Sequence, residues 1–305
     1  MPPQIEVLLS TELETAHAAG GALAVHQLRA VASPEEPDFA EGFAALDAEF
    51  GARGELERRA VLERWMQDGD GPGAPEGYFF LVARTRGGEL AAVRDCHVVV
   101  DGARAAVVVY LAHALVLPAH RRGGMGALLR AAPRALGRRA LTALDPGVAP
   151  PHLLLVAEME GWDPTDEDSR ARLVAYGRAG FAAIAPGELA YAQPDFRDAT
   201  AIDRAGGPQP VPLLLVARIE PAPPREGRIP VALAEAAIAG LHTVFASHCA
   251  AEHLRGPRAR ALASLRALTD PAPLVQLPRS PDDVGALEAL ARTRMLAGHA
   301  ASTEG

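Results

Sequence analysis

The pattern of apolar and polar positions along the chain predicts a mixed α/β protein. Two segments of strand length, 78–83 and 89–100, flank an Arg-Gly-Gly turn at 86–88, which predicts a β-hairpin. A longer apolar run, Val107–Leu117, predicts one buried strand that ends before Pro118, because proline cannot continue a strand ladder. Further strands are expected at 22–31, 152–157 and 211–219.

Helical spacing of apolar side chains predicts helices between these strands. Phe39, Phe43, Leu46 and Phe50 recur at intervals of three and four residues, and Gly51 ends the pattern. Further helices are expected at 55–67, 127–144 and 170–179. A proline inside the segment 127–144 is expected to kink or restart that helix.

The end of the chain has a different pattern. The stretch 221–225, Pro-Ala-Pro-Pro-Arg, is the best candidate for a linker, and residues 229–297 read as wholly helical. We therefore expect one domain at 1–222 and a helical C-terminal extension at 223–305.

Composition narrows the class of protein. The chain has 305 residues, of which 49% are hydrophobic and 22% are charged, as in soluble globular proteins. Its formal net charge of −8 argues against a general nucleic-acid binder. Lysine and asparagine are both absent beside abundant alanine, glycine, arginine and proline, which indicates a codon bias and excludes a lysine Schiff base.

The cysteine pattern and the absence of targeting signals in the sequence bear on where the protein is found and whether it binds a metal. Cys96 and Cys249 lie far apart without a CxxC motif, so neither a disulfide framework nor a zinc site is expected, and a reduced cytoplasm fits. No signal peptide pattern opens the chain, and no apolar run approaches the roughly 20 residues of a membrane span. We expect a cytoplasmic protein without a metal or a membrane partner.

The stretch after the long apolar run combines features of an anion site. Pro118 is followed by Arg121-Arg122-Gly123-Gly124-Met125-Gly126, and then a helical pattern opens. Glycines let backbone N–H groups approach an oxygen, a helix N-terminus adds positive potential, and arginine adds charge. The segment is neither a P-loop nor a GxGxxG motif. By itself it also fits a tight strand-to-helix turn with solvated arginines.

Three motifs together resemble the GCN5-related N-acetyltransferase superfamily. The segment Ala114–Leu129, ALVLPAHRRGGMGALL, is similar to the acyl-CoA-binding motif of that family. The apolar strand at 152–157 follows a helix of fitting length, and Tyr176-Gly-Arg-Ala-Gly-Phe181 is similar to the Tyr-xxx-Gly-Phe element of the family. The resemblance covers roughly residues 20–220. It implies an α/β (α+β) fold with a central, mixed, mostly antiparallel twisted sheet flanked by helices.

The resemblance also implies how a cosubstrate, acetyl-CoA, would be held. Backbone N–H groups of the turn would bind the pyrophosphate, and the unpaired backbone of the preceding strand would bind the pantetheine arm, with one N–H facing the thioester oxygen. The residues concerned are Leu115, Val116, Leu117, Arg121, Arg122, Gly123, Gly124, Met125 and Gly126. The family often has an asparagine on the next helix, where this chain has Ser169, which also reads as a helix N-cap.

Tyr176 is the candidate general acid. A phenol with a pKa near ~10 stays protonated at neutral pH and can donate to a thiolate whose thiol has a pKa near ~8.5. The alternative is a core tyrosine whose hydroxyl bonds a backbone carbonyl.

The general base is where the pattern departs from the family. The family often has Glu or His about eleven residues before the first motif arginine, and that position falls near Tyr110, with Ala112 next on the same face. His113 is expected on the other face, as a core histidine. Glu158 is our choice of base, and the alternative that the sequence favours for it is a solvated loop carboxylate. Other acceptors nearby are Glu160, Asp95 and His97.

Two further segments have open interpretations. The acidic loop 158–169 either favours the start of the next helix or overhangs an acceptor pocket and attracts a cationic amine. His242, His248 and His253 do not match a known metal-ligand spacing, so a packing or homodimerising role of the C-terminal helices is expected.

The function that the sequence predicts is an acetyl-CoA-dependent N-acyltransferase. It would act on a small-molecule or peptidyl amine by direct attack in a ternary complex. The alternatives are a non-catalytic acyl-CoA binder and an interaction module that no longer binds CoA.

Overall fold

The computed structural model describes residues 25–53, 55–69, 71, 74–121, 124–144, 151–197, 199–222 and 227–292. The chain forms two compact units, Met1–Val100 with Val109–Pro151, and Asp101–Val108 with His152–Gly305. The first three residues of the strand expected at 22–31 lie outside the described residues. The expected boundary near residue 222 falls inside the second unit.

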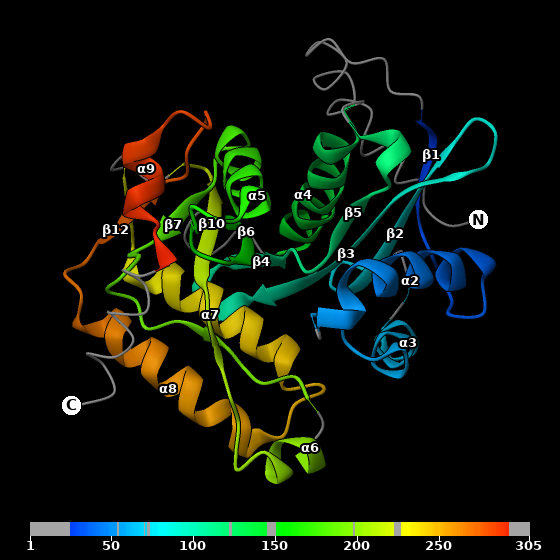
Figure 1. Ribbon diagram of the computed structural model, residues 1–305. Helices are drawn as coiled ribbons and strands as arrows, with labels where there is room; N and C mark the ends of the chain where they lie inside the picture. The colour runs from blue at the N-terminus through cyan, green and yellow to red at the C-terminus, as the bar shows by residue number, and fades with distance from the viewer. Residues whose placement is uncertain are drawn as a thin grey trace. The chain divides into compact units, whose positions relative to one another are not determined.

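The first unit is a small antiparallel sheet with helices on both sides (Figure 1). β1 (Val25–Ala30) pairs with β2 (Gly77–Thr85), and β2 pairs with β3 (Leu90–Asp101) through the predicted hairpin. α2 (Pro37–Phe50) and α3 (Arg59–Asp68) cover one side of the sheet, and α4 (Met125–Ala143) covers the other. A 3-10 turn, η1 (Gly51–Arg53), follows α2.

Side-chain alternation along β2 explains this arrangement. Tyr78 and Phe79 are neighbours in the chain but point to opposite faces of the sheet. The ring of Tyr78 packs against Trp65 of α3 with 5.2 Å between ring centroids. The ring of Phe79 lies under the Arg139 guanidinium of α4, 5.6 Å from its centroid. Because both faces of the strand are buried, the run from Phe79 to Ala83 is apolar throughout.

The long strand expected at Val107–Leu117 is two strands, which corrects the sequence prediction. β4 (Ala106–Tyr110) ends before Leu111, and β5 (Ala114–Val116) pairs separately with β3. The break occurs because the Asp95 side chain accepts the backbone N–H of His113 at 2.7 Å. Pro118 ends the segment as expected, and η3 (Pro118–His120) follows. α4 continues through Pro133 without restarting.

The second unit contains an antiparallel sheet in the order β6-β10-β7-β12-β11. Its strands are β6 (His152–Met159), β7 (Ala182–Ile184), β10 (Leu214–Glu220), β11 (Arg228–Ile229) and β12 (Ala272–Gln276). Its helices are α5 (Glu167–Arg178), α6 (Ala199–Arg204), α7 (Val231–Phe245), α8 (Ala251–Ala267) and α9 (Val284–Ala289), and η2 (Gly102–Arg104) precedes β4. β8 (Ala192–Gln193) and β9 (Val211–Pro212) form a separate pair.

The C-terminal segment is not wholly helical, contrary to the sequence prediction. β12 pairs with β7, so residues 272–276 extend the sheet of the second unit rather than lying in a separate helical layer. α7 and α8 are confirmed as helices and pack against each other. The mixed α/β class, with mostly antiparallel strands flanked by helices, is confirmed. No helix in the described ranges is long and apolar enough to cross a membrane.

Candidate functional site

The turn before α4 has the backbone geometry of an anion cradle. Gly124 is the N-cap residue, with φ of 81°, a left-handed conformation that favours glycine. The first turn of α4 has no acidic residue and no side-chain cap within the described chain. The N–H groups and positive potential of the helix N-terminus are therefore not neutralised by a carboxylate. Met125 is buried, while Arg121 and Gly124 are exposed.

Arg121 lies against the strand before the turn. Its Nε donates to the backbone oxygen of Val116 at 3.2 Å. Gly126, the third motif glycine, has room for a Cβ, which would meet only the flexible end of Arg130 at 3.4 Å. Gly124 is therefore the described glycine that the turn conformation requires. Arg122 and Gly123 lie outside the described residues.

The backbone of β5 corrects two of the three expected donors. The N–H of Leu117 donates to the Ala91 oxygen at 3.0 Å, so this donor is not unpaired. Leu115 is paired with Val93 in the same ladder. Because N–H groups of alternate residues point to opposite edges of a strand, the N–H of Val116 points away from β3. Val116 is thus the donor, among the three expected, that the pairing with β3 leaves available.

Tyr176 lies in the last turns of α5 and is half-buried. Its ring packs edge-on against Phe181 with 4.9 Å between centroids, and its backbone oxygen accepts the Phe181 N–H at 3.1 Å. Gly180 has φ of 81° and makes the tight turn between the two aromatic residues. In the described chain, no hydrogen bond engages the Tyr176 hydroxyl, so the backbone-bonded alternative is not seen.

Glu158 is a strand residue, not a solvated loop carboxylate. It lies in β6, half-buried, and accepts hydrogen bonds from the Tyr191 hydroxyl at 2.7 Å and from Gln193 Nε2 at 2.9 Å. Burial and the charge of Glu158 raise the pKa of Tyr191 well above its usual value, so Tyr191 remains a donor. Both hydrogen bonds hold the Glu158 carboxylate toward the β8 side of the strand.

Ser169 is buried, and its hydroxyl is engaged in its own loop. It donates to the Asp166 oxygen at 2.9 Å and accepts the Asp163 N–H at 3.3 Å. The N-cap of α5 is Asp166, whose side chain accepts the Asp168 N–H at 2.9 Å, so the N-cap role expected for Ser169 is wrong. The same bonds leave Ser169 little capacity to bind a cosubstrate. Asp166 caps α5, and Asp163 holds the turn before it by accepting the Thr165 N–H at 2.8 Å.

The sequence did not predict that Asp95 and His113 form one buried group. His113 Nδ1 lies 3.1 and 3.2 Å from the two Asp95 carboxylate oxygens, and its Nε2 lies 2.8 Å from the Glu55 backbone oxygen. The Tyr78 hydroxyl donates to Asp95 Oδ2 at 3.1 Å. The sequence held one sign of this group, a charged Asp95 inside a segment predicted to be a strand. Its partner His113 lies 18 residues further along the chain, so the sequence alone did not join the two.

The charge state of this pair decides its chemistry. Burial lowers the pKa of His113, but the charge and hydrogen bond of Asp95, with Glu57 3.7 Å from Nε2, raise it to about 10. An imidazolium cannot accept a proton at neutral pH, so His113 is not a base there. His113 is a core histidine, as the sequence predicted. Asp95 is fully buried, and burial by itself would raise the pKa of its carboxyl group. The charge and hydrogen bonds of His113 lower that pKa instead. The Asp95 carboxylate is already bonded to His113 and is not available as a base.

His97 belongs to the aromatic packing on the same side of β3. Its ring meets Trp65 edge-on at 4.5 Å between centroids and lies 4.9 Å from the ring of Tyr78 and 6.3 Å from that of Tyr110. It is buried, which favours a packing role over that of a base.

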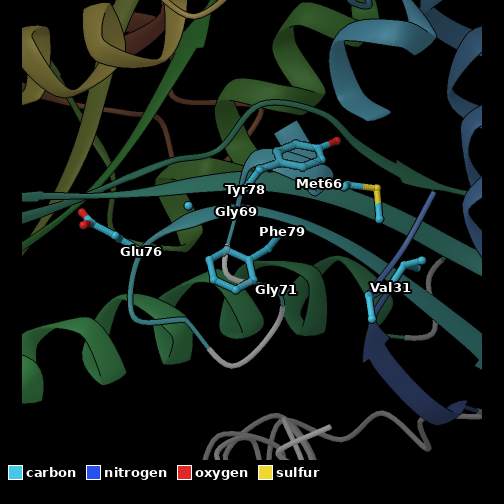
Figure 2. A pocket seen from close by; sticks show the side chains of 9 residues that line it. Val31, Met66, Gly69, Gly71, Glu76, Tyr78 and Phe79 are labelled. Carbon is cyan, nitrogen blue, oxygen red and sulfur yellow. The ribbon is translucent and has the colours of Figure 1, made fainter. Parts of the chain in front are cut away.

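A shallow pocket lies at the start of β2 (Figure 2). It is lined by Val31, Ala32, Met66, Gly69, Gly71, Glu76, Gly77, Tyr78 and Phe79. The side chains that line it are apolar apart from Glu76, which accepts the Val100 N–H at 3.3 Å, and Tyr78, whose hydroxyl is bonded to Asp95. These residues supply no nucleophile. Within the described ranges, no group of three or more His, Cys, Asp or Glu side chains is placed to hold a metal ion.

Comparisons with known proteins give structural similarities only. No protein-family model matches the chain, and no curated protein matches it. A GCN5-related N-acetyltransferase from Sphaerobacter thermophilus aligns with a TM-score of 0.35 and 17% identity, over 52% of this chain and 44% of that one. A GCN5-related glucosamine N-acetyltransferase region of a fungal multi-domain β-N-acetylglucosaminidase gives the same TM-score, identity and share of this chain, over 18% of that chain. This chain thus spans less than half of either protein.

A third solved structure aligns over more of its own length. A GNAT-superfamily phosphinothricin acetyltransferase from Sinorhizobium meliloti, in complex with acetyl-CoA, aligns with a TM-score of 0.27 and 16% identity, over 74% of this chain and 92% of that chain.

Proposed function

We propose that this chain is an N-acyltransferase that transfers an acetyl or other short acyl group from acyl-CoA to an amine. One observation carries the proposal: the uncapped N-terminus of α4, opened by Gly124 with a positive φ and preceded by Arg121. Such a helix N-terminus binds phosphate oxygens through backbone N–H groups. The Tyr-xxx-Gly-Phe element supports the same assignment.

The proposed reaction is direct attack of the amine on the thioester in a ternary complex. The amine nitrogen forms a bond to the thioester carbon, the carbon–sulfur bond breaks, and the amine gives up a proton. The Val116 N–H would stabilise the oxyanion, and Tyr176 would protonate the leaving thiolate. Glu158 is the proposed acceptor of the amine proton, directly or through water.

Isothermal titration with acetyl-CoA tests the binding half of the proposal. We expect saturable binding by the wild type and at least tenfold weaker binding by Arg121→Ala. Arg86→Ala, in the β2–β3 hairpin turn, is the matched control and is expected to bind as the wild type does. No binding by the wild type at high micromolar acetyl-CoA would refute the proposal.

Thiol release with a panel of amines tests the catalytic half. Tyr176→Phe keeps the ring against Phe181 and removes only the hydroxyl, so we expect kcat to fall about 10²-fold or more while KM changes little.

A non-catalytic acyl-CoA binder is the second candidate, and one observation favours it. The histidine in the segment between β4 and β5 is held as an imidazolium, so the segment offers no free base. This candidate predicts acetyl-CoA binding without thiol release from any amine, and no effect of Tyr176→Phe.

A further inference from the structure

Arg94 is the most deeply buried arginine among the described residues and has no partner there. It is 1% exposed, and its Nε and Nη2 atoms are both enclosed without a hydrogen-bond acceptor. No ion pair of the described chain reaches it. A guanidinium cannot lose its charge in a protein, so an unpaired one is among the most costly groups to bury.

The surroundings of Arg94 are apolar on its own face of the sheet. Arg94 is paired with Leu81 of β2 and Ala114 of β5, and it shares its face of β3 with Ala92 and Cys96. Burial raises the pKa of the Cys96 thiol to about 12, partly offset by the charge of Arg94, so this thiol supplies no anion. Ala114 is exposed, so solvent reaches this face of the sheet one residue from Arg94.

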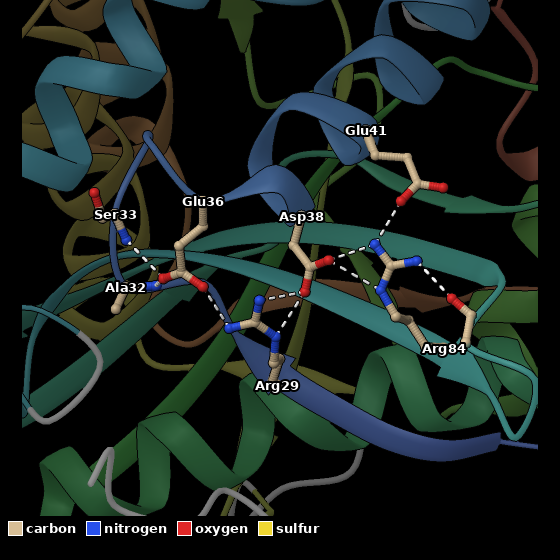
Figure 3. Close-up of polar contacts among 8 residues, drawn as sticks. Arg29, Ala32, Ser33, Glu36, Asp38, Glu41 and Arg84 are labelled. Carbon is tan, nitrogen blue, oxygen red and sulfur yellow. Dashed lines mark hydrogen bonds and ion pairs between the residues drawn. The ribbon is translucent and has the colours of Figure 1, made fainter.

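Other arginines of the chain show what the empty edge of Arg94 is suited to bind. Arg197 places Nε 2.9 Å from Asp195 Oδ1 and Nη2 2.6 Å from Oδ2. Arg29 and Arg84 direct the same two atoms at Asp38 (Figure 3). Nε and Nη2 form the parallel pair of donors that matches a carboxylate.

The contrast in burial makes the inference specific. The side chains of Arg29 and Arg84 are 35% and 18% exposed and could be solvated, yet both are paired. Arg94 is more deeply buried than either, yet its Nε and Nη2 atoms have no hydrogen-bond acceptor in the described chain. The missing partner therefore comes from outside the described chain.

We propose that Arg94 binds the carboxylate of a ligand through Nε and Nη2. The two ligands that could supply this carboxylate are named on the basis of the proposed function. One source is an acyl donor with a terminal carboxylate, and the other is an amine acceptor that carries a carboxylate. A carboxylate fits better than a phosphate because a single planar fork in an apolar, buried position suits a planar anion of single charge.

Three variants separate a ligand site from a structural role. Arg94→Met removes the charge and keeps the length of the side chain, Arg94→Lys keeps the charge and removes the fork, and Arg84→Met is the control on the neighbouring strand. A ligand site predicts that unliganded Arg94→Met unfolds at or above the wild-type Tm, because an unpaired buried charge is removed. Arg84→Met is expected to unfold below the wild-type Tm, since it removes one of the two arginines that pair with Asp38 and also the partner of Glu41.

Two experiments, one of binding and one of turnover, identify which ligand supplies the carboxylate. In the first, wild type and variants are titrated with acetyl-CoA and with succinyl-CoA. In the second, thiol release from acetyl-CoA is measured with amino acids and with the matching amino-acid amides. We expect the wild type to prefer the carboxylate-bearing ligand at least tenfold in one arm, and Arg94→Met and Arg94→Lys to lose that preference while Arg84→Met keeps it. The arm that shows the preference names the source.

Two outcomes overturn the proposal. One is a wild type without a carboxylate preference in either arm. The other is a Tm of Arg94→Met lowered as far as that of Arg84→Met, with the preference retained in Arg94→Lys. If neither CoA ester binds, the proposed function fails separately. A thermal-shift titration with free succinate then decides the anion site, which requires stabilisation of the wild type and none of Arg94→Met.

Discussion

His113 and His242 are both buried histidines, but their pKa values shift in opposite directions. Asp95 lies against the His113 ring, and the pKa of His113 is raised to about 10 although burial opposes this. Burial and the charge of Arg258 lower the pKa of His242 on α7 to about 4. The side chain of His113 is 10% exposed and His242 is 3% exposed, so burial alone does not decide the sign.

The difference lies in the partner. The attraction of the Asp95 carboxylate offsets the desolvation cost of a charged His113 ring. The same carboxylate accepts hydrogen bonds from the Tyr78 hydroxyl and from a backbone N–H. The His242 ring has no hydrogen-bond acceptor at either nitrogen in the described chain, and it packs edge-on against Phe245 at 5.6 Å between centroids. His113 is therefore held charged and His242 neutral at pH 7. Arg94 resembles His242 in lacking a partner but cannot discharge.

Asp95→Asn is the strongest way to break the comparison. It leaves the shape of the side chain and removes the charge that pairs with His113. Because one member of a buried ion pair is lost, we expect the free energy of unfolding to fall by about 3–5 kcal/mol. Urea unfolding at pH 7 measures it. Asp47→Asn, at an exposed position of α2, is the control and should change stability by less than about 0.5 kcal/mol. Equal effects of the two substitutions would contradict the assignment.

Alkaline pH tests the charge of His113. Its folded pKa lies above its unfolded value of about 6.5, so its contribution is complete below pH 6.5 and is lost as pH rises through about 10. We expect the free energy of unfolding of the wild type to fall between pH 7 and 9.5, and the fall to be smaller in His113→Gln. Parallel curves for the two proteins would show that His113 is not charged in the fold.

Acidic pH tests His242 with the opposite sign. Its folded pKa of about 4 lies below the unfolded value, so the unfolded chain binds more protons between pH 6.5 and 4 and stability falls as pH falls. The loss should reach about 3 kcal/mol at most. His242→Phe should remove this part of the acid sensitivity in urea unfolding at pH 4.5 against pH 7. An unchanged pH dependence in this variant would mean that His242 has a partner in solution.

Tyr78→Phe is the mildest change to the His113 group. It removes one donor to Asp95 and keeps the ring against Trp65, so we expect a loss of about 0.5–1.5 kcal/mol in urea unfolding. The loss of stability at alkaline pH should remain, because His113 still pairs with Asp95. A cost as large as that of Asp95→Asn would place the main interaction of Asp95 at Tyr78 instead of His113.

The sequence predicted the elements whose signal is local. The hairpin of β2 and β3, the helix that contains Phe39 and Leu46, and the strand at 152–159 are all present, because each has its own apolar period and its own turn residues. The turn that opens α4 was located for the same reason. Gly124, one of the glycines of that turn, adopts a left-handed conformation.

Predictions failed where a distant residue decides the local structure. The apolar run Val107–Leu117 looked continuous, but Asp95 of the neighbouring strand captures the His113 backbone and interrupts it. Residues 272–276 are a strand because β7 offers a free edge, not because of their own pattern. Ser169 read as an N-cap, yet Asp166 three residues earlier holds that position.

By itself, the sequence determined the class of fold, the order of its main elements and the glycine turn, since periodicity and turn chemistry act within a few residues. Only the tertiary structure decided which polar side chains are partnered. Asp95 meets His113, Glu158 meets Tyr191, and Arg94 and His242 meet no acceptor in the described chain. The physical reason is that the cost of a buried charge depends on groups within a few ångströms, and those groups come from segments far apart in the chain.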